Sequence, residues 1–105
     1  MSTNTFKNRF NLEFIEEKIK SIKPIIISRF YVKRIGIFGS VARGQVRKSS
    51  DVDILVEFSK TIDLLDFVAL EKYLSEQTGL KIDLVSFKAI RPEFKNAILE
   101  EVVYV

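Results

Sequence analysis

The sequence GSVARG occupies residues 39–44 and is followed by SDVD at residues 50–53. The first segment places a glycine-serine turn directly after an apolar run, and the second places two carboxylates at the start of another apolar run. A third carboxylate, Asp83, lies in the short apolar segment KIDLV at residues 81–85. A turn that can hold phosphate, together with acids that can hold a divalent ion, is what metal-assisted nucleotide chemistry requires.

The two acids of the SDVD segment are expected to act together. Side chains two apart on a strand point to the same face, so Asp51 and Asp53 should project together while Val52 and Ile54 turn into the core. Two such carboxylates repel each other unless a cation lies between them, and Asp83 on a neighbouring strand would complete a site for two ions. The chain has no histidine and no cysteine, so any ligands must be oxygen atoms, which favours Mg²⁺ or Mn²⁺. The alternative is that Asp51 caps a turn and Asp83 is a solvated acid at a strand end.

Gly39 and Ser40 predict a phosphate-binding turn between a strand and the start of a helix. Such a turn aims backbone N–H groups at one point, where Gly39 lets the backbone come close and Ser40 adds a hydroxyl donor. Arg43 lies about one helical turn further on and should reach a triphosphate. Gly44 is expected only to end the turn. A glycine-serine pair is common in loops, so its weight here comes from the acids that follow.

The length of 105 residues predicts one domain covering residues 1–105. Hydrophobic residues make up 47% of the chain, which suffices for a core, but a domain this small is not expected to wall a cleft on two sides. No apolar stretch is long enough to cross a bilayer, and the N-terminal residues lack a secretory pattern. A cytoplasmic location is therefore expected.

The net charge of +3 is mildly basic. Basic residues between positions 18 and 34 are typical of a solvated helix face, although a basic face can also bind nucleic acid. A second group, Arg43, Arg47 and Lys48, flanks the acids and is better placed to meet phosphate.

Apolar periodicity predicts an α/β (α+β mixed) fold, with helices covering one face of a small mixed sheet. Helices are expected at residues 11–21, 63–77 and 92–100, with a helical turn at 40–43. Strands are expected at residues 32–38, 52–58 and 82–86, with an edge strand within 102–105. Pro24 has no backbone N–H, so it should either kink the first helix or begin a second short helix through Arg29.

The spacing of Gly39-Ser40, ten residues and then Asp51-Val52-Asp53 resembles the glycine-serine-x10-Asp-x-Asp motif of the DNA polymerase β-like nucleotidyltransferase superfamily. The short chain is similar to the minimal branch of that superfamily, the MNT domains. The similarity extends through residues 38–44, 50–56, 82–85 and 101–105. It implies that the three acids, including Asp83, hold Mg²⁺, and that the glycine-serine turn holds the triphosphate. All these positions are filled, so the resemblance implies an active enzyme.

The resemblance further implies an MntA-type antitoxin, which pairs with a HEPN-domain toxin (an RNase) and neutralises it by adding AMP from ATP to a toxin tyrosine. The acceptor hydroxyl would attack the α-phosphorus in line, with Asp83 as the expected base and with Mg²⁺ and Arg43 neutralising the pyrophosphate. Since the chain is too short to build a second lobe, a partner protein is expected to supply the other wall of the site.

Three other functions fit parts of the sequence. The chain could be the catalytic subunit of a small-molecule (aminoglycoside-like) nucleotidyltransferase, or a non-enzymatic antitoxin that masks its partner by binding. It could also be a basic RNA-binding module, but three clustered acids would repel a phosphate backbone unless metal were present. Nucleic acid is therefore not an expected partner.

Overall fold

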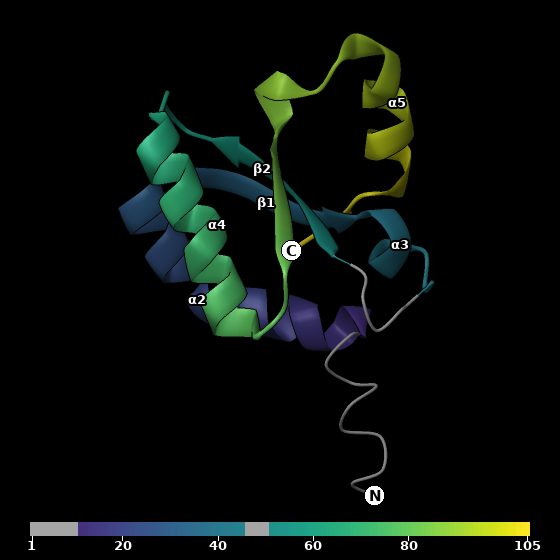
Figure 1. The fold of residues 1–105 in the computed structure, drawn as a ribbon, viewed down its shortest axis with the longest axis horizontal. Helices are drawn as coiled ribbons and strands as arrows, with labels where there is room; N and C mark the ends of the chain where they lie inside the picture. The colour runs from purple at the N-terminus through teal and green to yellow at the C-terminus, as the bar shows by residue number, and fades with distance from the viewer. Residues whose placement is uncertain (1–10, 46–50) are drawn as a thin grey trace, which may run out of the picture.

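The computed structural model describes residues 11–45 and 51–105 (Figure 1). Three helices of ten residues or more alternate with the strands: α2 (Leu12–Phe30), α4 (Leu64–Thr78) and α5 (Pro92–Glu101). The strands are β1 (Val32–Phe38), β2 (Val52–Phe58), β3 (Ile82–Ser86) and β4 (Val103–Tyr104). The described residues also include two short helical segments, α3 (Gly39–Ala42) and the 3-10 helix η2 (Phe87–Ala89). The predicted mixed α/β class is confirmed, and no helix in the described part of the chain is long and apolar enough to cross a membrane.

The first helix continues through Pro24 without a second helix beginning there. Of the two alternatives expected at Pro24, a kink or a separate short helix through Arg29, the second is therefore wrong, and the helix expected at residues 11–21 extends to Phe30. Proline removes one hydrogen bond from the helix ladder, but Ile22 and Ile26 on either side of it are both buried. Burial of these side chains offsets the lost hydrogen bond, since each buried isoleucine contributes about 1.5–3 kcal/mol.

The four strands form one sheet in the order β3-β2-β1-β4. Strand β2 pairs antiparallel with β1 and parallel with β3, so the sheet is mixed as predicted. The predicted ranges for β1, β2 and β3 match the observed ones. The edge strand expected within residues 102–105 is β4, whose two residues pair with Gly36 and Ile37 of β1.

Helices α2 and α4 pack together on one face of the sheet, and α5 lies apart from them beside α3 (Figure 1). The core between α2, α4 and the sheet is built from buried apolar residues that recur at helical or strand spacing: Ile15, Ile19, Ile22, Ile26, Phe30, Ile35, Ile37, Val52, Ile54, Val56, Leu70, Leu74, Ile82 and Leu84. Alternate residues of the strands point to the opposite face of the sheet. That face carries the acids.

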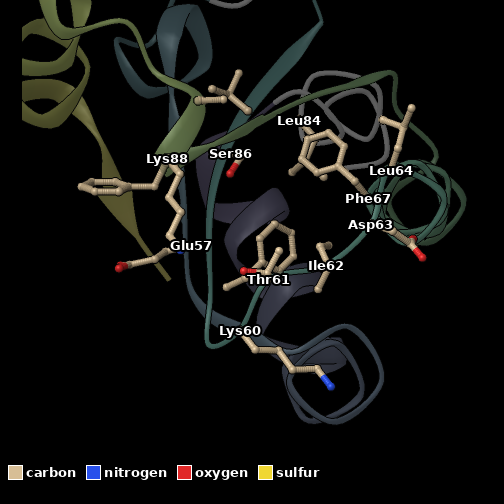
Figure 2. A pocket seen from close by; sticks show the side chains of 14 residues that line it. Glu57, Lys60, Thr61, Ile62, Asp63, Leu64, Phe67, Leu84, Ser86 and Lys88 are labelled. Atoms are coloured by element: carbon tan, nitrogen blue, oxygen red, sulfur yellow. The ribbon is translucent and has the colours of Figure 1, made fainter.

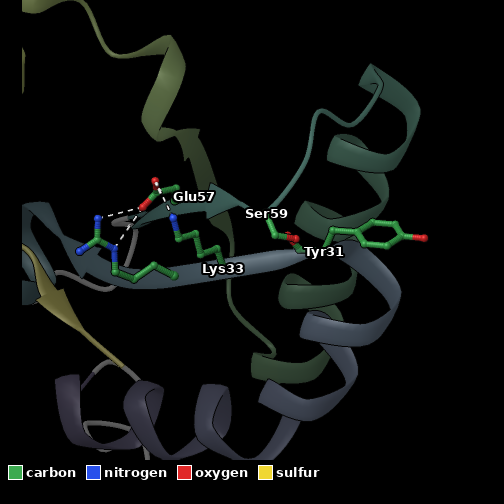
Figure 3. Close-up of polar contacts among 5 residues, drawn as sticks. Tyr31, Lys33, Glu57 and Ser59 are labelled. Atoms are coloured by element: carbon green, nitrogen blue, oxygen red, sulfur yellow. Dashed lines mark hydrogen bonds and ion pairs between the residues drawn. The ribbon is translucent and has the colours of Figure 1, made fainter.

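Polar contacts hold β1 and β2 together at the end of the sheet away from these acids (Figure 3). The Glu57 carboxylate pairs with Arg34 at 2.8 Å and lies 4.0 Å from the Lys33 ammonium. Tyr31, with φ of 57°, ends α2 in the left-handed conformation, and its carbonyl accepts hydrogen bonds from the Ser59 amide and hydroxyl. The turn from α2 into β1 is thereby tied to the end of β2.

Candidate active site

Two of the three predicted acids lie opposite each other on neighbouring strands. Asp53 of β2 and Asp83 of β3 are register partners in the parallel pairing. Their chain neighbours Val52, Ile54 and Ile82 are buried in the core, so both carboxylates point to the opposite face of the sheet. The expectation that a neighbouring strand would bring Asp83 to the SDVD segment is confirmed.

Asp51 lies immediately before β2 and is half-buried, like Asp53. Its carboxylate Oδ1 is 3.9 Å from the ammonium of Lys81, which precedes Asp83 by two positions. The lysine side chain is 81% exposed, so this ion pair is weak and easily exchanged. Asp51 therefore remains at the rim of the same site as the other two acids.

The surroundings of Asp53 perturb its titration. The pKa of Asp53 is raised to about 6, most of all by partial burial and then, in decreasing order, by the charges of Asp83 and Asp51, hydrogen bonding to Asp83 and the charge of Glu101. A carboxylate in this surrounding gains from a nearby cation, which would remove the repulsion among the acids. Such a perturbed carboxyl is typical of a functional site.

The donor set fits a hard divalent ion, because every candidate ligand is a carboxylate oxygen. Within residues 11–45 and 51–105, however, no three acidic side chains are close enough to bind an ion as they stand. Asp51 lies 3.9 Å from the Lys81 ammonium, and the Asp53 carboxylate lies against Gly39. Side-chain rotations of these acids, without a change of strand register, would be needed to bring their oxygens together.

Gly39 connects β1 to α3 directly beside Asp53. It is buried, has a φ of 76°, and a methyl group built on it would collide with the Asp53 carboxylate. The left-handed conformation and the missing side chain are therefore both required here. Gly44 has the same φ of 76°, but a methyl group there would meet nothing within 4 Å. The missing side chain at Gly39 makes room for the Asp53 carboxylate, and the close approach of the Gly39 backbone to a phosphate stays a prediction.

The helical turn predicted at residues 40–43 is α3, which begins one residue earlier. Ser40 lies half-buried on this turn and Arg43 follows it at the surface. The remaining basic residues predicted to flank the acids, Arg47 and Lys48, fall outside the described residues.

Glu101 is a residue of the site that the sequence did not predict. Its Oε1 accepts a hydrogen bond from the Gly39 N–H at 3.0 Å, and its Oε2 pairs with Arg43 Nη1 at 2.8 Å. Glu101 ends α5, more than fifty positions from both partners, so local spacing carries no signal of these contacts. The only pointer in the sequence is the similarity of residues 101–105 to the nucleotidyltransferase pattern.

A cavity of about 540 Å³ lies elsewhere, at the opposite ends of β2 and β3 (Figure 2). It is bordered by Lys60 and Ile62 after β2, by Phe67 of α4 and by Leu84 and Ser86 of β3 (Figure 2). Its nearest point on β2 is four positions beyond Asp53, which corresponds to about 13 Å along a strand. On β3 the cavity reaches Leu84, the residue after Asp83, but Leu84 is buried on the core face whereas Asp83 points to the opposite face, so none of the three acids lines the cavity.

The chain belongs to the nucleotidyltransferase domain family, whose sequence pattern matches residues 6–105. Enzymes of this family use divalent metal ions, in agreement with the carboxylate site. A Thermococcus cleftensis chain named protein adenylyltransferase MntA is 44% identical over 90% of this chain and 95% of its own length. A Methanocaldococcus jannaschii relative is 46% identical over 87% of this chain and 94% of its own length.

Solved structures show the same fold. A minimal nucleotidyltransferase superposes with a TM-score of 0.77 at 32% identity, covering 89% of this chain and 94% of its own. A complex of tri-AMPylated Shewanella oneidensis HEPN toxin with MNT antitoxin matches with a TM-score of 0.61 at 21% identity, covering 83% of this chain and 66% of its own. At that identity the second likeness shows the fold alone. The predicted family and the predicted enzyme class, a nucleotidyltransferase, are confirmed.

Proposed function

We propose that this chain is an Mg²⁺-dependent protein adenylyltransferase that transfers AMP from ATP to a tyrosine hydroxyl of a HEPN-domain toxin, and so acts as its antitoxin. The single observation that carries the proposal is the register of Asp53 and Asp83 beside the Gly39 turn. Two relatives described above add support: one is named a protein adenylyltransferase, and a solved homologous fold is bound to an AMPylated HEPN toxin.

Asp51, Asp53 and Asp83 would hold the metal, with two Mg²⁺ ions expected and Mn²⁺ a possible substitute. When bound, the metal lowers the pKa of the acceptor hydroxyl and neutralises charge on the leaving pyrophosphate. Asp83 is exposed whereas Asp53 is half-buried. Asp83 is therefore better placed to reach a hydroxyl on a partner and to take its proton as general base.

Gly39, Ser40 and Arg43 would bind the triphosphate. The Ser40 hydroxyl and the Arg43 guanidinium are hydrogen-bond donors on the turn next to Asp53. Arginine suits this role because its planar group donates several hydrogen bonds to phosphate oxygens. The oxygen of the acceptor forms a bond to the α-phosphorus as the bond to the pyrophosphate breaks, so AMP is transferred and pyrophosphate leaves.

Asp83 is exposed and Asp51 and Asp53 are half-buried, so a partner could cover the site. We take residues 1–105 as a single catalytic domain that works in the cytoplasm, with the toxin supplying the acceptor and the second wall. The side of the adenine that this domain leaves exposed would then contact protein only in the complex. This division of labour would let the domain transfer a nucleotide that it does not enclose by itself.

The experiment uses ATP labelled at either the α- or the γ-phosphate. The chain is incubated with Mg²⁺ and a HEPN-domain protein that co-purifies with it, and label on each protein is measured. The proposal predicts α-label on the HEPN protein, no γ-label, and loss of labelling when the acceptor tyrosine is replaced by phenylalanine. Neutralisation of the toxin without any transferred label would contradict the proposal and indicate masking by binding.

A further inference from the structure

Glu101, the last residue of α5, contacts both Gly39 and Arg43, which lie at the two ends of the turn that follows β1. One oxygen of its carboxylate accepts the Gly39 N–H at 3.0 Å, and the other pairs with Arg43 Nη1 at 2.8 Å. Gly39 begins α3, and the residue before it, Phe38, provides no side-chain cap. Glu101 therefore satisfies a backbone donor at the start of α3 and also fixes the arginine that follows its end.

The position of Glu101 is set by the strand that follows it. Strand β4 pairs with Gly36 and Ile37, and the Val105 N–H donates to the Ile35 carbonyl at 2.9 Å. Gly36 allows this close packing, because a methyl group there would come within 2.6 Å of the Val102 side chain. Glu101 is thus held from its C-terminal side by β1, the strand that leads into the Gly39 turn.

The contact differs from an ordinary surface ion pair. The Glu101 side chain is only 27% exposed and each of its oxygens has a separate partner, whereas isolated surface pairs are mobile and weak. Charge-assisted hydrogen bonds of this kind are short and directional. Gly39, whose N–H donates to Glu101, lies directly against the Asp53 carboxylate, so the Glu101–Arg43 pair lies next to the acids.

We infer that Glu101 is a positioning residue for nucleotide binding. Its carboxylate holds the Arg43 guanidinium beside the Gly39 turn, so that the arginine side chain is already oriented when a triphosphate binds. The inference rests on the proposed function of Arg43. A guanidinium carries several N–H donors, and the bond from Nη1 to Glu101 leaves others for phosphate oxygens. Fixing the long arginine side chain beforehand lowers the entropy lost when ATP binds.

The test compares Glu101→Gln with Glu100→Gln, a matched control on the exposed neighbouring residue of α5. Glutamine keeps the size of Glu101 and an oxygen for the Gly39 N–H, but it loses the charge that holds Arg43. Calorimetric titration with Mg²⁺-tripolyphosphate should show about fivefold to tenfold weaker binding for Glu101→Gln and no change for Glu100→Gln. In the transfer assay, the KM for ATP should rise by a similar factor while kcat stays within about twofold.

Arg43→Gln and the double variant show whether Glu101 acts through Arg43. If it does, Arg43→Gln weakens tripolyphosphate binding, and adding Glu101→Gln to that variant causes little further loss. Unchanged binding by Glu101→Gln would overturn the inference, and tighter binding would overturn it by showing that Glu101 competes with phosphate for Arg43. In both cases AMP transfer by the native chain would leave the proposed function standing. Conversely, weaker tripolyphosphate binding by Glu101→Gln in a chain that transfers no AMP would support the inference and contradict the proposed function.

Discussion

Asp53 and Asp83 are register partners on the parallel strands β2 and β3, and the charge of Asp83 helps to raise the pKa of Asp53. Two acids in this position repel each other when both are charged, and burial adds to the cost of charging Asp53. The site therefore stores an unfavourable electrostatic free energy that a bound cation would remove.

Replacing Asp53 with asparagine should stabilise the metal-free protein above about pH 6. The pKa of Asp53 is raised to about 6 from 3.8, so between these pH values the folded state binds more protons than the unfolded state. The free energy of unfolding therefore falls as pH rises from about 4 to about 6. Asparagine removes this loss. Since the side chain is only partly buried, the expected gain is about 1 kcal/mol at about pH 7.5 and close to zero at about pH 4. The difference in the free energy of unfolding between the variant and the native chain is measured by urea unfolding in chelator at both pH values.

Glu76→Gln is the control for this stability experiment. Glu76 is exposed on α4, so the loss of one negative charge there should leave the free energy of unfolding within about 0.5 kcal/mol at either pH. An Asp53→Asn variant that is less stable than the native chain at the higher pH would show that the Asp53 carboxylate is stabilised by its surroundings, contrary to this account.

Gly39→Ala and Gly44→Ala form a matched pair. Both glycines have a φ of 76°, so backbone strain alone should cost alanine about 1 kcal/mol of stability at either position, and the collision at Gly39 should add to that cost. Only at Gly39 does the added methyl group collide with Asp53. Gly39→Ala should therefore also lose most of the AMP transfer, whereas Gly44→Ala should retain it. Thermal unfolding and transfer rates measured side by side separate the two effects, and equal activity of the two variants would show that the Gly39–Asp53 contact does not matter for catalysis.

Nucleotide transfer should require a divalent ion. The chain has neither histidine nor cysteine, and the clustered groups are carboxylates, so Mg²⁺ or Mn²⁺ should support transfer. Transfer is measured after dialysis against chelator and again after each ion is added back. Undiminished transfer in excess chelator would rule out a catalytic ion at the three acids.

The isolated chain should bind ATP weakly and distinguish ATP poorly from GTP. Affinity should come mainly from the triphosphate and metal, because a base exposed to water gains little from burial. The 540 Å³ cavity does not change this expectation, since it lies at the far ends of β2 and β3. Calorimetric titrations with and without the HEPN-domain partner should show that the partner improves both affinity and base choice. Tight, base-selective binding by the chain alone would mean that it holds a complete pocket.

The sequence predicted the strands and the turn well, because each signal is local. Runs rich in β-branched residues mark β1, β2 and β3, and Gly39 directly follows the first of them. The sequence alone could not show that α2 continues past Pro24, since this depends on isoleucines that only the folded core buries.

Contacts between distant parts of the chain were harder to predict. The pairing of Asp53 with Asp83 follows from the register of parallel strands, which the crossover through α4 sets and which no local pattern specifies. The hydrogen bond from Gly39 to Glu101 spans 62 positions. Such contacts depend on tertiary packing, so no local spacing singles out Glu101, and only the family resemblance of residues 101–105 points to this end of the chain.

The most direct test of the central claim is the rate of AMP transfer to the HEPN-domain partner by Asp53→Ala. The account predicts that this rate falls by at least about a hundredfold, because Asp53 is expected to hold the metal that makes transfer possible. Asp66→Ala, which removes an exposed acid on α4, should transfer at the native rate in the same assay. Transfer by Asp53→Ala at the native rate would contradict the account and show that the acid pair of β2 and β3 is structural.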